Sequence, residues 1–224
     1  MLYFTGDTHG EKARFSPINM PDEPLTENDV LIICGDFGFI YYDTVNESEI
    51  LDELEKKPYT ICFVDGNHEN FPAIFRFPLE EWNGGSIHRI RKNVIHLMRG
   101  QVFNIQGKKV FTFGGAYSID RAIRQKDISY WAEELPSSKE YKEAVENLKK
   151  SGMAVDYVVS HTAPKEIILR MGKNPDLHDI ELTGFLEWVM YEVKFTAWYF
   201  GHWHQDKTVY EKFRALYFDV VSER

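Results

Sequence analysis

Residues 30–36 read VLIICGD, residues 47–57 read ESEILDELEKK, and residues 59–67 read YTICFVDGN. The first and third segments are apolar runs that stop at a glycine and a polar residue, as buried strands do where they enter loops. The middle segment spaces its isoleucine and leucines at helical intervals. Strand, helix and strand in this order predict a βαβ unit, and therefore a parallel pair of strands.

Other segments extend this pattern on both sides. Residues 93–98, 101–105 and 108–113 are short runs split by glycine-containing turns, and they predict an antiparallel meander. Ser137 and Glu140 form a capping box that opens a helix closing near Gly152, and residues 179–193 have a second amphipathic pattern. Further strands are expected at residues 2–5, 157–160, 196–200, 207–211 and 215–221. With strands near both ends of the sequence and no linker, we expect residues 1–224 to form a single domain.

Composition narrows the class of protein. The chain has 224 residues, of which 43% are hydrophobic and 27% are charged, so a disordered or fibrous chain is excluded. No apolar stretch reaches the length of a membrane span, and the first seven residues lack the basic start of a secretory signal. The two cysteines, Cys34 and Cys62, lie within apolar runs and indicate buried thiols. We therefore expect a cytoplasmic protein that has no membrane partner.

The charge is unevenly distributed. The net charge is −9, which disfavours nonspecific coating of nucleic acid, although nucleic acid stays open as a partner. Residues 76–126 nevertheless carry ten basic and three acidic residues. This basic stretch is either a solvated hairpin or a face that attracts an anion.

Side chains of metal-ligand type follow five of the expected strands. Five of the eight histidines lie at these points, which packing alone does not explain. In open α/β sheets, ligands bind outside the carboxyl ends of the strands. No cysteine is near, and this nitrogen and oxygen donor set suits divalent Mn, Fe, Zn, Co or Ni. The residues concerned are Asp7, His9, Asp36, Asn67, His68, His161, His202 and His204.

This pattern resembles the calcineurin-like metallophosphoesterases, outside their Ser/Thr protein phosphatase branch. The resemblance runs from residue 6 to residue 204 and rests on five blocks in order. They are Gly6-Asp7-Thr8-His9, Gly35-Asp36, Gly66-Asn67-His68-Glu69, Ser160-His161 and Gly201-His202-Trp203-His204. It implies an α/β fold in which two mixed β-sheets pack face to face between helices, as a four-layer αββα sandwich.

The resemblance also implies residue roles. A first metal ion would be held by Asp7, His9 and His204. A second would be held by Asn67, His161 and His202, with Asp36 bridging the two. His68 matches the general acid of the family. The cofactors would be two divalent transition metal ions, of which we favour manganese.

The implied function is a dinuclear metal-dependent phosphoesterase. A metal-bound hydroxide would attack phosphorus in line, and His68 would protonate the leaving oxygen. The substrate would be a phosphodiester, a nucleotide or a small phosphomonoester. A metal-binding but inactive scaffold that recruits a partner is the alternative, and no expected ligand is missing here. Sequence leaves the native metal, the oligomeric state and any protein partner open.

The chain departs from the protein phosphatase branch in three places. That branch continues Gly-Asp with x-x-Asp-Arg-Gly, whereas Phe39 and Ile40 stand at the Asp and Arg positions. It also places Arg before Gly-Asn-His-Glu, where this chain has Asp65. Phosphoprotein phosphatase activity is therefore disfavoured. We expect a replacement phosphate contact from Arg121, with Arg124 as the alternative, because both follow a glycine pair after a strand.

Overall fold

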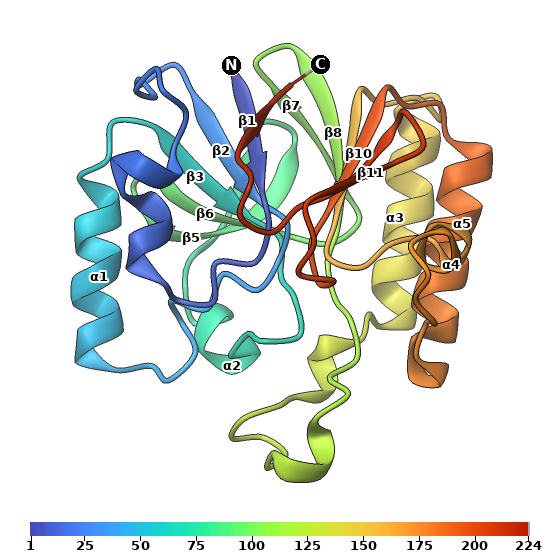
Figure 1. The fold of residues 1–224 in the computed structure, drawn as a ribbon, viewed down its shortest axis with the longest axis horizontal. Coiled ribbons are helices and arrows are strands. Elements are labelled where there is room, and N and C mark those ends of the chain that lie inside the picture. Colours follow the sequence, from blue (N-terminus) through green and yellow to red (C-terminus); the bar gives the residue numbers. More distant parts are fainter. Residues whose placement is uncertain (224) are drawn as a thin grey trace.

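Two mixed β-sheets pack face to face, and helices cover both outer faces (Figure 1). The structure, a computed structural model, describes residues 1–223. The first sheet has seven strands in the order β13-β1-β2-β3-β6-β5-β4, and the second has six in the order β11-β12-β10-β9-β8-β7. The expected fold class is confirmed.

The elements have the following bounds. The first sheet contains β1 (Leu2–Thr5), β2 (Val30–Ile33), β3 (Thr60–Phe63), β4 (Leu79–Trp82), β5 (Gly85–Arg91), β6 (Val94–Leu97) and β13 (Val221–Ser222). The second contains β7 (Gln101–Ile105), β8 (Lys108–Phe113), β9 (Tyr157–Ser160), β10 (Ala197–Phe200), β11 (Lys207–Val209) and β12 (Phe213–Ala215). The helices are α1 (Val45–Glu55), α2 (Phe71–Ile74), α3 (Ser138–Lys150), α4 (Lys165–Arg170) and α5 (Ile180–Glu192). Short 3₁₀ helices are η1 (Lys12–Phe15), η2 (Pro17–Asn19), η3 (Arg121–Ile123), η4 (Ala132–Glu134) and η5 (Leu177–Asp179).

Three apolar clusters separate the four layers. Strand β2 is an example, because its two faces pack into two different clusters. Val30 and Ile32 point into the cluster between the sheets, whereas Leu31 and Ile33 point toward α1. A strand that is buried on both faces reads as a continuous apolar run, which is what the sequence has. Helices α3, α4 and α5 cover the outer face of the six-stranded sheet in the same way.

The expected βαβ unit is confirmed. Strands β1, β2 and β3 are parallel neighbours, and α1 lies between β2 and β3 in the chain. A capping box formed by Thr44 and Glu47 opens α1, and the expected box of Ser137 and Glu140 opens α3. The carboxyl ends of β1, β2 and β3 therefore lie side by side at one edge of the sheet.

The expected meander is wrong. Strand β6 joins the seven-stranded sheet, parallel to β3 and antiparallel to β5, whereas β7 and β8 form a hairpin in the other sheet. The chain crosses between the sheets at Arg99 and Gly100, and Gly100 has φ +74°. Local patterns located these strands, but their partners are set by burial against distant segments. The same limit explains why β4 and β5 were missed. The strand expected at residues 207–211 ends at Val209. The strand expected at residues 215–221 is wrong, because β12 ends at Ala215 in one sheet, β13 begins at Val221 in the other, and the residues between them are irregular.

Two irregular segments flank the carboxyl ends of the strands. The lobe, residues 114–136 between β8 and α3, projects from the body of the molecule at the bottom of Figure 1. The cleft loop, residues 171–179, connects α4 to α5. Within residues 1–223, no helix is long and apolar enough to cross a membrane.

Candidate metal centre

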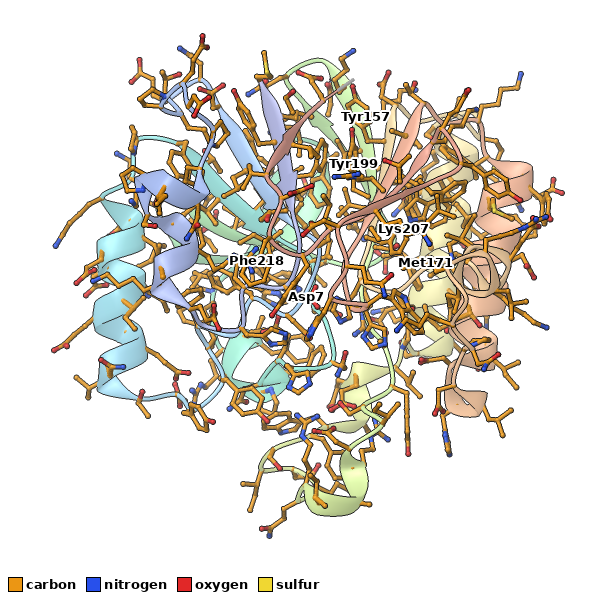
Figure 2. All side chains as sticks on the ribbon, in the orientation of Figure 1. Asp7, Tyr157, Met171, Tyr199, Lys207 and Phe218 are labelled. Atoms are coloured by element: carbon orange, nitrogen blue, oxygen red, sulfur yellow. The ribbon has the colours of Figure 1, made fainter. Side chains whose placement is uncertain are left out.

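The predicted ligands converge at one edge of the two sheets. Asp7 and His9 follow β1, Asp36 follows β2, and Asn67 follows β3 of the first sheet. His161 follows β9 of the second sheet, while His202 and His204 follow its neighbour β10. Figure 2 places Asp7 beyond the end of β1, at the edge where the loops of both sheets meet. The face-to-face packing of the sheets therefore assembles the whole set.

One group surrounds the amide oxygen of Asn67. Its Oδ1 lies 3.0 Å from Nε2 of His161 and 3.0 Å from Nδ1 of His202. Oδ1 of Asp36 lies 3.4 Å from the same His161 nitrogen. Four donors from four strand ends therefore face a common point.

The second group is centred on Asp7. Nε2 of His204 lies 3.1 Å from Oδ2 of Asp7 and 3.0 Å from Nε2 of His9. Nε2 of His9 is also 3.8 Å from Oδ2 of Asp36. Asp36 thus presents one oxygen to each group, as a bridging carboxylate requires. The ligand atoms of Asp7, His9 and His204 all lie within 4.8 Å of one another, and so do those of Asp7, Asp36 and His161.

The donor chemistry fits a cation. Nδ1 of His161 lies 2.9 Å from the carbonyl oxygen of Cys34, which can only accept, so Nδ1 carries a proton. The amide nitrogen of Asn67 donates to Ser118 Oγ at 3.1 Å, which turns Oδ1 toward His161 Nε2. Two atoms with lone pairs then face each other at 3.0 Å. A proton or a metal ion between them removes this repulsion.

Burial and charge prepare these groups for coordination. Burial, together with the charge of nearby His161, lowers the pKa of His202 to about 3, so the imidazole is neutral and can bind a metal. Burial by itself raises the pKa of Asp36. The charges of nearby His161, His68 and His9 outweigh burial and hold that pKa well below its usual range. The carboxylate is therefore ionised at neutral pH.

The backbone around the centre is strained. His9, Asp36, His202 and His204 all have positive φ, between 46° and 65°. Such conformations are costly for residues other than glycine and persist where the surroundings fix them. Here the backbone amide of His202 donates to both carboxylate oxygens of Asp7, at 2.9 and 3.0 Å. Each loop therefore holds a ligand of another loop in place.

Glycines in the motifs make room for these contacts. A Cβ built on Gly66 would lie 2.0 Å from Oδ1 of Asp36. A Cβ on Gly201 would lie 2.0 Å from Oδ1 of Asp7. The glycine of one motif thus gives space to the ligand of another motif, and any larger residue would displace that ligand.

His68 borders the cleft beside the centre. Its backbone amide donates to Oδ1 of Asp36 at 2.8 Å, and its ring meets that of His9 edge-on at a centroid distance of 5.4 Å. Phe39 and Ile40 are 1% and 3% exposed and pack in the outer core. The positions that carry Asp and Arg in protein phosphatases therefore supply no polar group near His68.

The lobe uses its two arginines internally. Nη2 of Arg121 donates to Oε2 of fully buried Glu134 at 2.7 Å, and the guanidinium lies over the rings of Tyr117 and Tyr130. A phosphate contact by Arg121 would require this ion pair to break. Arg124 donates to Ser118, Asp120 and Tyr41. The geometry favours an anchoring role for both arginines.

Ser118 connects the lobe to the candidate centre, and sequence reasoning missed it. Its Oγ accepts from Nη1 of Arg124 at 2.6 Å and from Nδ2 of Asn67, and it donates to the Asn67 carbonyl oxygen at 3.2 Å. These three bonds use the full capacity of a hydroxyl group. Ser118 therefore fixes the orientation of the Asn67 amide, a role that no local sequence signal reveals.

The lysine and arginine side chains of the basic stretch do not line this cleft. Arg89 pairs with Glu80 at 2.5 Å and Arg91 with Asp52 at 2.7 Å, along β5. Lys173, which sequence reasoning also missed, is the one lysine or arginine among the described residues that line this cavity of about 740 Å³. Positive charge in this cavity therefore comes from the cleft loop, whereas Arg124 lines a neighbouring pocket together with His9 and His68.

A family model of the calcineurin-like phosphoesterases matches residues 2–206. The chain belongs to this family. Its members are generally hydrolases of phosphate esters and typically hold two divalent metal ions. The two Asp/His groups described above lie within the matched residues of this calcineurin-like chain. No curated protein matches the chain.

Proposed function

We propose that this protein is an active phosphoesterase that uses two divalent transition metal ions, with manganese favoured, to hydrolyse a phosphodiester, a nucleotide or a small phosphomonoester. The observation that carries the proposal is Asp36, whose two oxygens face the Asn67 group and the Asp7 group separately. A single-ion site has no use for such an arrangement. Inactive descendants of metalloenzymes often lose a ligand, and here both groups are intact.

Bound divalent ions would supply Lewis acidity, which activates a water and neutralises the phosphoryl oxygens. The chain would do the rest. Asp7, His9 and His204 would hold one ion, and Asn67, His161 and His202 the other. The backbone amides of His202 and His68 orient the carboxylates of Asp7 and Asp36.

His68 is proposed as the general acid. It lies at the cleft, next to the ligand Asn67, and its ring is directed toward His9. Protonation of the leaving oxygen would keep a poor leaving group from departing as an alkoxide. No carboxylate stands at Phe39 to orient this ring, which separates the proposed site from that of a phosphoprotein phosphatase. Arg121 stays a predicted substrate contact.

We propose the cytoplasm as the compartment, on the basis of the two cysteines. Cys34 and Cys62 are buried and unpaired, as in a reducing compartment, which favours the cytoplasm.

Metal-dependent turnover tests the proposal. The chelated protein would be reloaded with Mn, Fe, Zn, Co or Ni and assayed with p-nitrophenyl phosphate and bis(p-nitrophenyl) phosphate. We expect hydrolysis that saturates at two ions per chain and disappears on chelation. Two bound ions without hydrolysis of any phosphate ester would instead identify a metal-bound scaffold.

A further inference from the structure

The cleft beside the candidate metal centre has two walls of unusual composition. The lobe contributes Tyr117, Ile119 and Asp120 to one wall, and the cleft loop contributes Lys173 and Leu177 to the other. Both walls therefore come from the irregular segments that flank the carboxyl ends of the strands. What these walls present decides what the site accepts next to the phosphate.

The walls expose large aliphatic groups. Ile119 and Leu177 are each 80% exposed, and both line the cleft. A single exposed aliphatic side chain is ordinary, but apolar groups gathered at one cleft mark a binding surface. Tyr117, whose ring stacks on that of His178 at a centroid distance of 4.1 Å, lines the same cleft.

The same walls are poor in positive charge. Besides Lys173, the cleft lining holds three carboxylates outside the metal-ligand set, those of Asp120, Asp176 and Asp179. Asp120 is paired with Arg124 at 3.1 Å. Hydrogen bonds from the His178 amide and ring hold the pKa of Asp176 below its usual range, so it is charged. A second anionic group on a substrate would therefore meet carboxylates, while one phosphate has Lys173 and the candidate centre.

We propose that the substrate is an ester with a single phosphate whose organic group is apolar and uncharged, lying between Ile119 and Leu177. This inference rests on the proposed function, because it assumes that the site hydrolyses a phosphate ester. The binding test below does not depend on that hydrolysis. Polyphosphates, oligonucleotides and phosphates with further carboxylates are disfavoured by the acidic walls. Ile119 and Leu177 are then specificity residues, and Lys173 contacts the phosphate.

Binding of non-hydrolysable phosphonates tests the inference independently of turnover. Calorimetry on the manganese-loaded protein would compare methylphosphonate, hexylphosphonate and 6-phosphonohexanoate. We expect hexylphosphonate to bind at least about tenfold more tightly than methylphosphonate, because each buried methylene adds roughly fourfold. The terminal carboxylate should cancel this gain. Equal affinities for the methyl and hexyl compounds, tighter binding of the carboxylate, or no binding at all would overturn the inference.

Matched variants locate the effect. The double variant Ile119→Ser with Leu177→Ser should lose the hexyl preference, and both replaced side chains are too exposed to matter for folding. Ile123→Ser, at an 88% exposed residue of the same lobe that does not line the cleft, should retain it. Lys173→Met should weaken the binding of methylphosphonate and of hexylphosphonate by the same factor. A preference that survives the double variant would also overturn the inference.

Turnover separates this inference from the proposed function. Methyl and hexyl p-nitrophenyl phosphodiesters share a leaving group and differ only in the second ester. A hexyl preference in both binding and hydrolysis supports both proposals. A hexyl preference in binding, with no hydrolysis of these diesters or of p-nitrophenyl phosphate, would leave this inference standing and refute the phosphoesterase activity.

Discussion

The candidate metal centre and the adjoining lobe differ in how deeply their side chains are buried and in which contacts hold their backbone. At the centre, Asp7, Asp36 and His161 are 0–2% exposed, and strained loops lock one another in place. In the lobe, Ile119 and Ile123 are 80% and 88% exposed, and Glu134 with the arginines holds an irregular segment together. The contrast suggests a rigid part that carries the chemistry and an adaptable part that selects the substrate.

The largest effect is expected from Asp36→Ala. The bridging carboxylate serves both groups, so the variant should lose both ions and at least about 10³-fold in turnover, since a metal contributes several kcal/mol to the transition state. Metal analysis after desalting would measure occupancy. Asp52→Ala, at a carboxylate on α1 that pairs with Arg91, is the control. Two ions bound to the Asp36 variant with unchanged affinity would refute the bridging role.

His68→Ala should keep both ions and slow hydrolysis by roughly 10²–10⁴-fold, the range of general acid catalysis. The loss should shrink for esters with good leaving groups, because they need little protonation. A series of aryl phosphodiesters with leaving-group pKa values from about 4 to 10 would measure this. An equal loss across the series would argue against the acid role.

Ser118 connects the lobe to the candidate metal centre. The variant Ser118→Ala should therefore reduce metal affinity. Without the hydroxyl the Asn67 amide can rotate, and loss of such a supporting contact typically costs 10–100-fold in affinity. Metal titration should show one ion weakened and the other unchanged, with rescue by Ser118→Thr. Ser129→Ala is the control, because its hydroxyl bonds to Gln125 within the lobe. Equal weakening of both ions would contradict this role.

Arg121→Ala should lower the free energy of unfolding. It leaves the buried carboxylate of Glu134 without its closest cation, at a cost of about 2 kcal/mol in the free energy of unfolding. Urea unfolding would measure this, with exposed Lys126→Ala as the control. A stable variant with weakened methylphosphonate binding would instead support the predicted phosphate contact.

The smallest effect is expected from Asp179→Asn in the cleft loop. Burial raises the pKa of Asp179 to about 6, so the folded state binds a proton that the unfolded state has already lost. Stability from this group is therefore present below about pH 4 and lost as the pH rises through 6. The variant should be about 1–2 kcal/mol more stable than the parent at pH 8, with a smaller gain at pH 5. A gain independent of pH would refute this.

Sequence and structure agree best where short-range patterns and chemistry coincide. The seven predicted ligands follow strands that the apolar runs located, and parallel pairing brings them to one edge. The lobe shows the opposite case. The pairing of Arg121 with Glu134 and the bonds of Ser118 to Asn67 join distant positions through irregular backbone, which no periodicity encodes. The path of β6 was missed for the same reason.

Anomalous diffraction from crystals grown with manganese would test the central claim most directly. The account predicts two peaks per chain, one among Asp7, His9 and His204 and one among Asn67, His161 and His202. Asp36 should coordinate both ions, and the two should lie about 3.5–4 Å apart. A single peak, or two peaks that do not share Asp36, would contradict it.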